Sequence, residues 1–264
     1  MQSATIKRMP SLFVGHGNPM NAIEDNRWSR AFEALGGTLP TPAAYLCISA
    51  HWYGPGVYLT GNDRPETIHD FGGFPRELFQ AQYSAPGSAE LASTLSSQLA
   101  KYGAQVTLSW GLDHGTWTVM KFLRPTADVP VLQLSIDQRL SAAQHLELGR
   151  AIADLRDESI MILGSGNVTH NLPDAISHFG LPDAPPPAWA AQFDADVARA
   201  ALQHDSEFLV QLASKPEFRT SHPTPDHYLP LLYTVGAATE EDTVSFPVTG
   251  FDLGSLSMRA IQYG

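Results

Sequence analysis

The hydrophobic pattern of the chain is built around short apolar runs that stop at a histidine or at a glycine-rich turn before one. Such a run is typical of a buried strand, and open α/β sheets bind ligands in the crevice outside the carboxyl ends of their strands. Three histidines that follow three such strands are therefore expected to share one site. The runs and their histidines are 11–15 before His16, 44–50 before His51, and 160–163 before His170.

Between these runs the apolar residues recur at helical spacing. The pattern predicts helices over 26–35, 88–101, 141–156 and 188–204, and further strands over 58–60, 105–109, 129–136 and 244–248. Gly36 and Gly37 are expected to end the first helix, and residues 110–117 are predicted to be a loop. A cap at Thr224 predicts a late helix that carries His227 in its first turn and extends to Val235.

Strands and helices mostly alternate, and no repeat or convincing linker interrupts them. This order predicts one α/β domain over residues 1–264, with a largely parallel central sheet that is flanked by helices. The expected ligand site lies at the carboxyl ends of the strands. A proline-rich stretch over 182–187 is expected to be an exposed connection.

Composition narrows the class of protein. The chain has 264 residues, of which 43% are hydrophobic, and a formal net charge of −11. This charge disfavours a nucleic-acid or anionic-membrane partner on electrostatic grounds. Met1–Pro10 lacks an apolar signal-peptide core, and no apolar run is long enough to span a bilayer. The single cysteine, Cys47, fits a buried thiol and a cytoplasmic location.

Histidine is the residue type that points to chemistry, because neutral imidazole is the commonest protein ligand for transition metals. Each of four histidines lies at the end of a predicted element, which favours a metal site assembled by folding. Any one of them alone fits a surface or core histidine better, and no HExxH or paired CxxC spacing is present. The candidate metal ligands are His16, His51, His170 and His227.

Six sequence blocks together resemble the class III extradiol ring-cleavage dioxygenases, and most closely their DOPA extradiol dioxygenase branch. They occur in the order typical of that family and extend over nearly the whole chain. Each block alone is a weak signal, and the set is specific. The blocks are FVGHGNPM at 13–20, SAHW at 49–52, IHDFGGFP at 68–75, DHGTW at 113–117, GSGNVTHN at 164–171 and HPTPDHYLP at 222–230.

The resemblance implies a mononuclear divalent metal in a single α/β domain with a mixed sheet. Ferrous iron is implied for activity, and zinc is also possible as the bound ion. By position, His16, His51 and His227 look like ligands, while His170 matches an active-site histidine that acts as a base or binds the metal. The wider class uses two histidines and a carboxylate, so a histidine in the third place is a departure that also suits zinc.

The remaining site residues are predicted to contact substrate: Asn18, Trp52 and His114, of which His114 is also a candidate catalytic residue. The resemblance implies that a DOPA-like catechol is opened with O2 to a semialdehyde. Its partners are then a small aromatic diol and O2, and the chain is expected to be a monomer or a small homo-oligomer. A zinc-dependent hydrolase and a non-catalytic metal-binding protein remain as alternatives.

Overall fold

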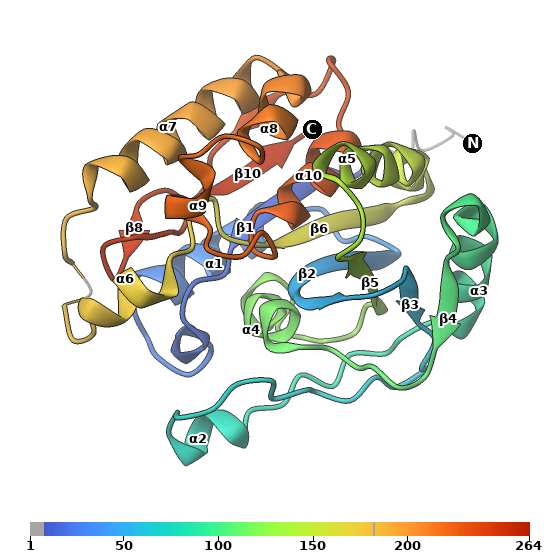
Figure 1. The fold of residues 1–264 in the computed structure, drawn as a ribbon. Coiled ribbons are helices and arrows are strands. Elements are labelled where there is room, and N and C mark those ends of the chain that lie inside the picture. The colour runs from blue at the N-terminus through green and yellow to red at the C-terminus, as the bar shows by residue number, and fades with distance from the viewer. Residues whose placement is uncertain (1–7, 182) are drawn as a thin grey trace.

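The apolar runs form the middle of an eight-stranded sheet in the computed structural model, which describes residues 8–181 and 183–264 (Figure 1). The strand order is β4-β3-β5-β2-β6-β1-β10-β7, and the four central strands β5, β2, β6 and β1 are parallel. Antiparallel pairs occur between β3 and β5, β1 and β10, and β10 and β7, so the sheet is mixed. The predicted α/β fold with a mostly parallel sheet is confirmed.

The sheet strands are β1 (Ser11–Gly15), β2 (Ala44–Gly54), β3 (Tyr58–Thr60), β4 (Gln105–Thr107), β5 (Val131–Asp137), β6 (Ile160–Gly166), β7 (Val244–Ser245) and β10 (Ala260–Tyr263). A separate two-stranded pair consists of β8 (Phe251–Asp252) and β9 (Leu256–Ser257).

The α-helices are α1 (Arg27–Thr38), α2 (Arg76–Phe79), α3 (Ala89–Gln98), α4 (His114–Leu123), α5 (Ala142–Ala151), α6 (Leu172–Ser177), α7 (Ala188–Leu202), α8 (Ser206–Leu212), α9 (Phe218–Ser221) and α10 (Leu229–Gly236). Short 3-10 turns cover Pro19–Ala22, Ala100–Tyr102 and Ala153–Glu158.

Both faces of the central strands are buried, as expected for parallel strands covered by helices on each side. Alternate residues of β1 show this: Phe13 belongs to one apolar cluster, while Leu12 and Val14 belong to the other. Helices α3, α5, α8 and α10 contribute to the first cluster, and α1 and α4 contribute to the second. The sheet is therefore a rigid support for whatever lies at its carboxyl edge.

Three local predictions were wrong. Helix α1 continues through Gly36, because a glycine there lets it approach α4: a Cβ at Gly36 would lie 2.6 Å from the Phe122 carbonyl oxygen. Helix α4 begins at His114 inside the predicted loop, capped by the Asp113 side chain. Helix α10 begins only at Leu229, so His227 precedes it, and Pro230 occupies the first turn where its missing N–H costs no hydrogen bond.

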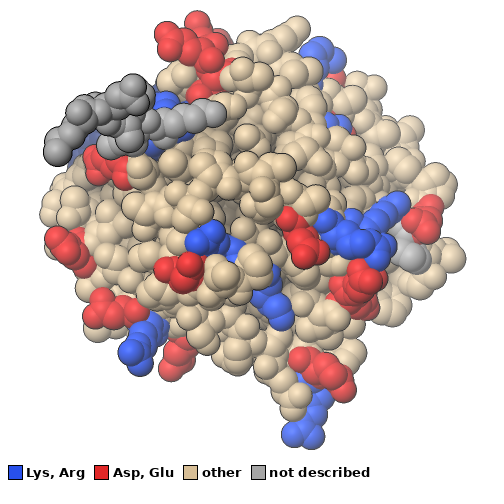
Figure 2. All heavy atoms as spheres, turned by 180° about the vertical axis from the view of Figure 1, so that it is seen from behind, with Lys and Arg blue, Asp and Glu red and all other residues tan. Residues whose placement is uncertain are grey.

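Two predictions fall partly outside the described residues. Residues 1–7 belong to the stretch expected to lack a signal-peptide core, and Pro182 belongs to the predicted exposed connection. Within 8–181 and 183–264, every helix is too short or too polar to cross a bilayer. Figure 2 shows one face of the molecule on which basic side chains lie singly or beside acidic ones, with no broad basic surface.

Candidate metal centre

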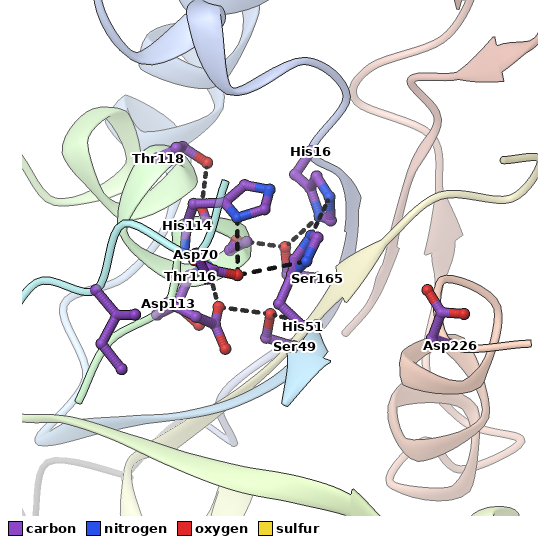
Figure 3. Close-up of polar contacts among 12 residues, drawn as sticks. His16, Ser49, His51, Asp70, Asp113, His114, Thr116, Thr118, Ser165 and Asp226 are labelled. Atoms are coloured by element: carbon purple, nitrogen blue, oxygen red, sulfur yellow. Dashed lines mark hydrogen bonds and ion pairs between the residues drawn. The ribbon is translucent and has the colours of Figure 1, made fainter. Parts of the chain in front are cut away.

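A cavity of about 400 Å³ opens at the carboxyl edge of the central strands. Five histidines line it, and they come from the ends of β1, β2 and β6, the start of α4, and the turn before α10. Folding thus brings together all of the histidines that the sequence singled out. Figure 3 shows three of them in one group, with Asp226 on the opposite side. The five are His16, His51, His114, His170 and His227.

His16 is held in one tautomer by a short hydrogen-bond relay. The Ser165 hydroxyl donates to the Gly115 carbonyl oxygen at 2.5 Å, so its oxygen is left to accept the Nδ1–H of His16 at 3.0 Å. Nδ1 therefore carries the proton, and Nε2 keeps its lone pair. That Nε2 lies 3.2 Å from Nε2 of His51.

Asp70 contacts two of the histidines, His51 and His114 (Figure 3). Its Oδ2 lies 2.9 Å from Nδ1 of His114 and 3.5 Å from Nδ1 of His51, and its Oδ1 accepts the backbone N–H of His114. Burial opposes ionisation of Asp70, but the hydrogen bond and charge of His114 outweigh it, so the pKa of this carboxyl falls below its ordinary value. The carboxylate orients both rings by their Nδ1 atoms.

The backbone beside His51 has no room for a side chain at Gly115. A Cβ there would lie 2.5 Å from the Ser49 hydroxyl oxygen and 2.8 Å from Cδ2 of His51. Ser49 donates to the buried Asp113 carboxylate at 2.6 Å, and Gln133 donates to the same carboxylate at 2.7 Å. The start of α4 is thus packed directly against the end of β2.

His227 and His170 form the other half of the histidine group. The Nδ1–H of His227 donates to Asp226 at 2.5 Å, and its ring stacks on His170 with centroids 3.5 Å apart. The His227 ring centroid lies 5.2 Å from that of His16 and 5.0 Å from that of His51. Asp226 does not line the cavity, and its carboxylate supports His227 from behind.

Four of the cavity histidines, His16, His51, His170 and His227, are neutral at pH 7. Burial, followed by the neighbouring imidazoles, lowers the pKa of His51 to about 3, and burial lowers the pKa of His170 to about 4. Burial also lowers the pKa of His16 and of His227 well below the ordinary range. The neutral form is the one that binds metal ions and accepts protons.

This donor set fits a divalent transition metal. Among the described residues, one nitrogen from each of His16, His51 and His114 forms a set within 4.8 Å of one another. Asp70 faces Nδ1 of His51, so the lone pair on Nε2 of His51 points at the lone pair on Nε2 of His16. The two lone pairs repel each other, and a cation bound between them would be attracted to both. Nitrogen donors of intermediate softness suit iron and zinc.

Of the three predicted substrate contacts, His114 and Asn18 line the cavity and Trp52 does not. Asn18 lines the cavity, and its side-chain oxygen accepts the Met20 N–H at 3.0 Å. Trp52 does not line it: the indole stacks on Trp110 with centroids 5.3 Å apart and borders a separate hollow. The prediction that Trp52 binds substrate at the histidines therefore finds no support, because alternation along β2 turns adjacent side chains to opposite faces.

Sequence reasoning gave no role to Asp70 or Ser165, which orient the histidines. Asp70 lies 44 positions before its main partner His114, so only its presence in a glycine- and aromatic-rich loop hinted at function. Ser165 lies inside Gly-Ser-Gly at the end of β6, where it resembled a tight turn. Asp226 adjoins His227 in sequence, which was a usable signal for a supporting carboxylate.

Comparisons with known proteins agree with this site. Residues 25–253 match the family described as the catalytic LigB subunit of aromatic ring-opening dioxygenase. The chain belongs to this family. Its relatives include a 4,5-DOPA dioxygenase extradiol of Escherichia coli (strain K12), 47% identical over 97% of this chain and 95% of that protein.

A second relative, named 4,5-DOPA dioxygenase extradiol, comes from Beta vulgaris and is 36% identical over 96% of each chain. The crystal structure of an uncharacterized protein from Escherichia coli K12 superposes with a TM-score of 0.83, at 42% identity, over 97% of this chain and all of that one. The protein is thus an extradiol aromatic ring-opening dioxygenase of the LigB family, as the sequence blocks predicted.

Proposed function

We propose that this dioxygenase opens a catechol with O2 at a single ferrous ion in the histidine cavity. The carbon–carbon bond beside the diol breaks, and the two oxygen atoms end in the product, one as an aldehyde and one in a carboxylic acid. The observation that carries the proposal is the convergence of five buried or half-buried histidines on one cavity, with the Nε2 atoms of His16 and His51 3.2 Å apart. No further oxidant or reductant is needed.

We assign His16, His51 and His227 as the metal ligands. The set whose nitrogens all lie within 4.8 Å of one another contains His114 and not His227. We favour His227 because its Nδ1 is committed to Asp226, which leaves Nε2 as a lone-pair donor; carboxylate–histidine pairs of this kind are typical of metal ligands. A bound Fe(II) ion supplies Lewis acidity that makes the phenol easier to deprotonate, and it leaves positions open for substrate and O2.

His170 is suited to accept the phenol proton. It is neutral at pH 7 because burial lowers its pKa to about 4, and its ring is fixed by stacking on His227. Its proposed role is that of general base, a task for which imidazole is well matched near neutral pH. The stacking keeps the base beside the ligand set and excludes water from one of its faces.

His114 is suited to contact the substrate. Its Nδ1 lies 2.9 Å from the ionised Asp70 carboxylate, which holds the ring in place, and the ring lines the cavity. We assign it to hydrogen-bond the substrate and to donate a proton as the ring opens. Asn18 lies on the same cavity wall and is a second polar contact for the diol.

The cellular setting is part of the same proposal. The buried thiol of Cys47, the single cysteine, is compatible with a reducing compartment. We therefore place the protein in the cytoplasm. We also propose that residues 1–264 form one domain and that the protein is a monomer or a small homo-oligomer. Its partners are a small aromatic diol and O2.

The test is anaerobic reconstitution with Fe(II), confirmed by metal analysis, followed by catechols and oxygen. We expect oxygen uptake and a yellow product, with both lost in zinc-loaded protein and in His170→Ala. Iron-loaded protein that opens no catechol would overturn the proposal. A nitrogen-only ligand set also suits zinc, so in that case ester and amide hydrolysis by the zinc-loaded form is the next measurement.

A further inference from the structure

The histidine cavity has two chemically different walls. Its inner wall consists of the five histidines. Its outer wall is apolar and centres on Leu172 and Ile176 of α6 and on Phe179 just beyond it, with Phe71 and Phe74 from the loop before α2. In Figure 1, α6 and α2 lie on the side of the sheet where β1 and β2 end.

The outer wall leaves large apolar side chains uncovered. Leu172 is 50% exposed, Ile176 is 61% exposed and Phe179 is 75% exposed. Soluble proteins rarely cluster such residues without a binding role, and these three border the cavity itself. A substrate whose ring is held at the histidines would place its substituent toward this surface and shield it from water.

The cavity offers no partner to a charged substituent. Among the described residues, its lining includes no Lys, Arg, Asp or Glu, and apart from the histidines the one polar side chain is Asn18, whose oxygen already accepts the Met20 N–H. The carboxylates that support the histidines, Asp70 and Asp226, are engaged with His114 and His227, and Asp174 on α6 faces His178. A carboxylate or ammonium group moved into such surroundings loses hydration without gaining a counter-ion.

We propose that the preferred substrates are catechols with an uncharged, apolar substituent, and that Ile176 and its neighbours on the outer wall select them. This inference rests on the proposed catechol site but goes beyond it, because the relatives carry the name of DOPA, a catechol whose ring substituent bears an ammonium and a carboxylate group. The selection comes from the outer wall alone, so the inner wall need not differ among catechols.

The test compares four catechols with side chains of similar length. They are 4-propylcatechol, which is uncharged; 3-(3,4-dihydroxyphenyl)propionate, an anion; dopamine, a cation; and DOPA, a zwitterion. Dissociation constants are measured by calorimetry on the zinc-loaded protein without oxygen, and kcat/KM is measured on the iron-loaded enzyme. We expect 4-propylcatechol to bind about tenfold more tightly than each charged compound, or better. An effect of this size is typical of a substrate group that does not match its pocket.

Substitutions at Ile176 sharpen the test, since its exposure makes a charge tolerable for folding. Ile176→Arg should bring the propionate within a few-fold of 4-propylcatechol, and Ile176→Glu should do so for dopamine. Leu202→Arg is the matched control, because Leu202 is 55% exposed on α7 and does not line the cavity. Its affinities should follow those of the unmodified protein.

The two proposals fail separately. Iron-loaded enzyme that turns over none of the four compounds contradicts the proposed function, and the zinc-form dissociation constants still decide the preference. If DOPA or either singly charged compound binds as tightly as 4-propylcatechol, the apolar selection is wrong. The same holds if both Ile176 variants leave the order of affinities unchanged.

Discussion

The inner and outer walls of the cavity differ in how firmly the fold holds them. Three of the five inner histidines lie at the carboxyl ends of strands in an eight-stranded sheet, and His16, His114 and His227 each have Nδ1 directed at a polar group. The outer wall stands on a six-residue helix and a loop, and its side chains on or just beyond the helix are half or more exposed. The rigid wall suits chemistry that needs fixed geometry, and the peripheral wall suits recognition that can vary.

This comparison predicts two classes of mutational effect. Changes on the inner wall should alter metal affinity and turnover for every catechol alike. Changes on the outer wall should alter the order of substrates while leaving the metal in place. The experiments that follow are ordered by the size of the effect that we expect.

The largest effect is expected from removing a proposed ligand. His51→Ala deletes an Nε2 that lies 3.2 Å from that of His16, so metal affinity should fall by more than the roughly 10- to 100-fold that outer supporting groups contribute. Calorimetric titration with zinc and metal analysis after gel filtration measure this loss. His178→Ala is the control, since His178 does not line the cavity. A His51→Ala protein that keeps full metal affinity would refute the assignment.

A smaller effect is expected when a supporting carboxylate is neutralised. Asp70→Asn keeps the shape but weakens the contacts to Nδ1 of His114 and His51, so we expect a loss of roughly 10- to 100-fold in kcat/KM or metal affinity. Asp128→Asn removes the same charge from an exposed pair with Arg124 and should change neither. Equal effects of the two variants would show that net charge, and not ring orientation, is what matters.

The sequence predicted the inner wall far better than the outer one. Apolar runs ending at His16 and His51 predicted buried strands with histidines at their ends, and in the parallel sheet these ends lie close together. Tertiary support was harder to foresee. Asp70 is 44 positions from His114, and the close approach at Gly115 depends on how α4 packs against β2. A local pattern carries no information about such contacts.

The outer wall was missed because a sequence does not show which apolar side chains are buried and which are exposed. Leu172, Ile176 and Phe179 have spacing typical of a core-facing stripe, and only the structure shows them exposed beside a cavity. The placement of Trp52 failed for a similar reason. Its position next to His51 suggested a shared site, but the two side chains leave β2 in different directions, and Trp52 packs on Trp110.

A further prediction asks whether burial alone keeps the histidines neutral. His222 is buried outside the cavity, where its Nε2–H donates to the Val168 carbonyl oxygen at 2.8 Å, and burial lowers its pKa to about 3. The unfolded chain binds this proton near pH 6.5 and the native protein does not. Stability should therefore fall as the pH drops from about 6.5 toward 3, by about 1.4 kcal/mol per pH unit for this group.

Urea unfolding of the metal-free protein between pH 7 and 5 measures this slope. His222→Phe replaces the imidazole with a ring that fits an aromatic cluster including Phe218 and Tyr228. The pH slope of the unfolding free energy should decrease by the equivalent of about one bound proton, whatever the variant's stability at pH 7. An unchanged slope would mean that His222 is protonated in the native state. Burial would then be an insufficient reason for the neutrality of His16, His51, His170 and His227.

The smallest effect is expected on the outer wall. Ile176→Ser removes exposed apolar surface, so the free energy of unfolding should change by no more than about 0.5 kcal/mol. The KM for 4-propylcatechol should rise by roughly fourfold for each buried methylene contact that is lost, at about 0.8 kcal/mol apiece. The KM for unsubstituted catechol and the metal affinity should stay the same, because neither depends on this wall. Leu202→Ser is the matched control.

The pattern across these measurements matters more than any single value. If Ile176→Ser raised KM for both catechols equally, α6 would be acting on the ring or on the metal, and the two walls would not be functionally separate. If it changed KM for 4-propylcatechol alone, the substituent would have to lie against Ile176, which is 61% exposed without it. A six-residue helix at the rim would then set substrate choice without disturbing the histidines that the sheet holds in place.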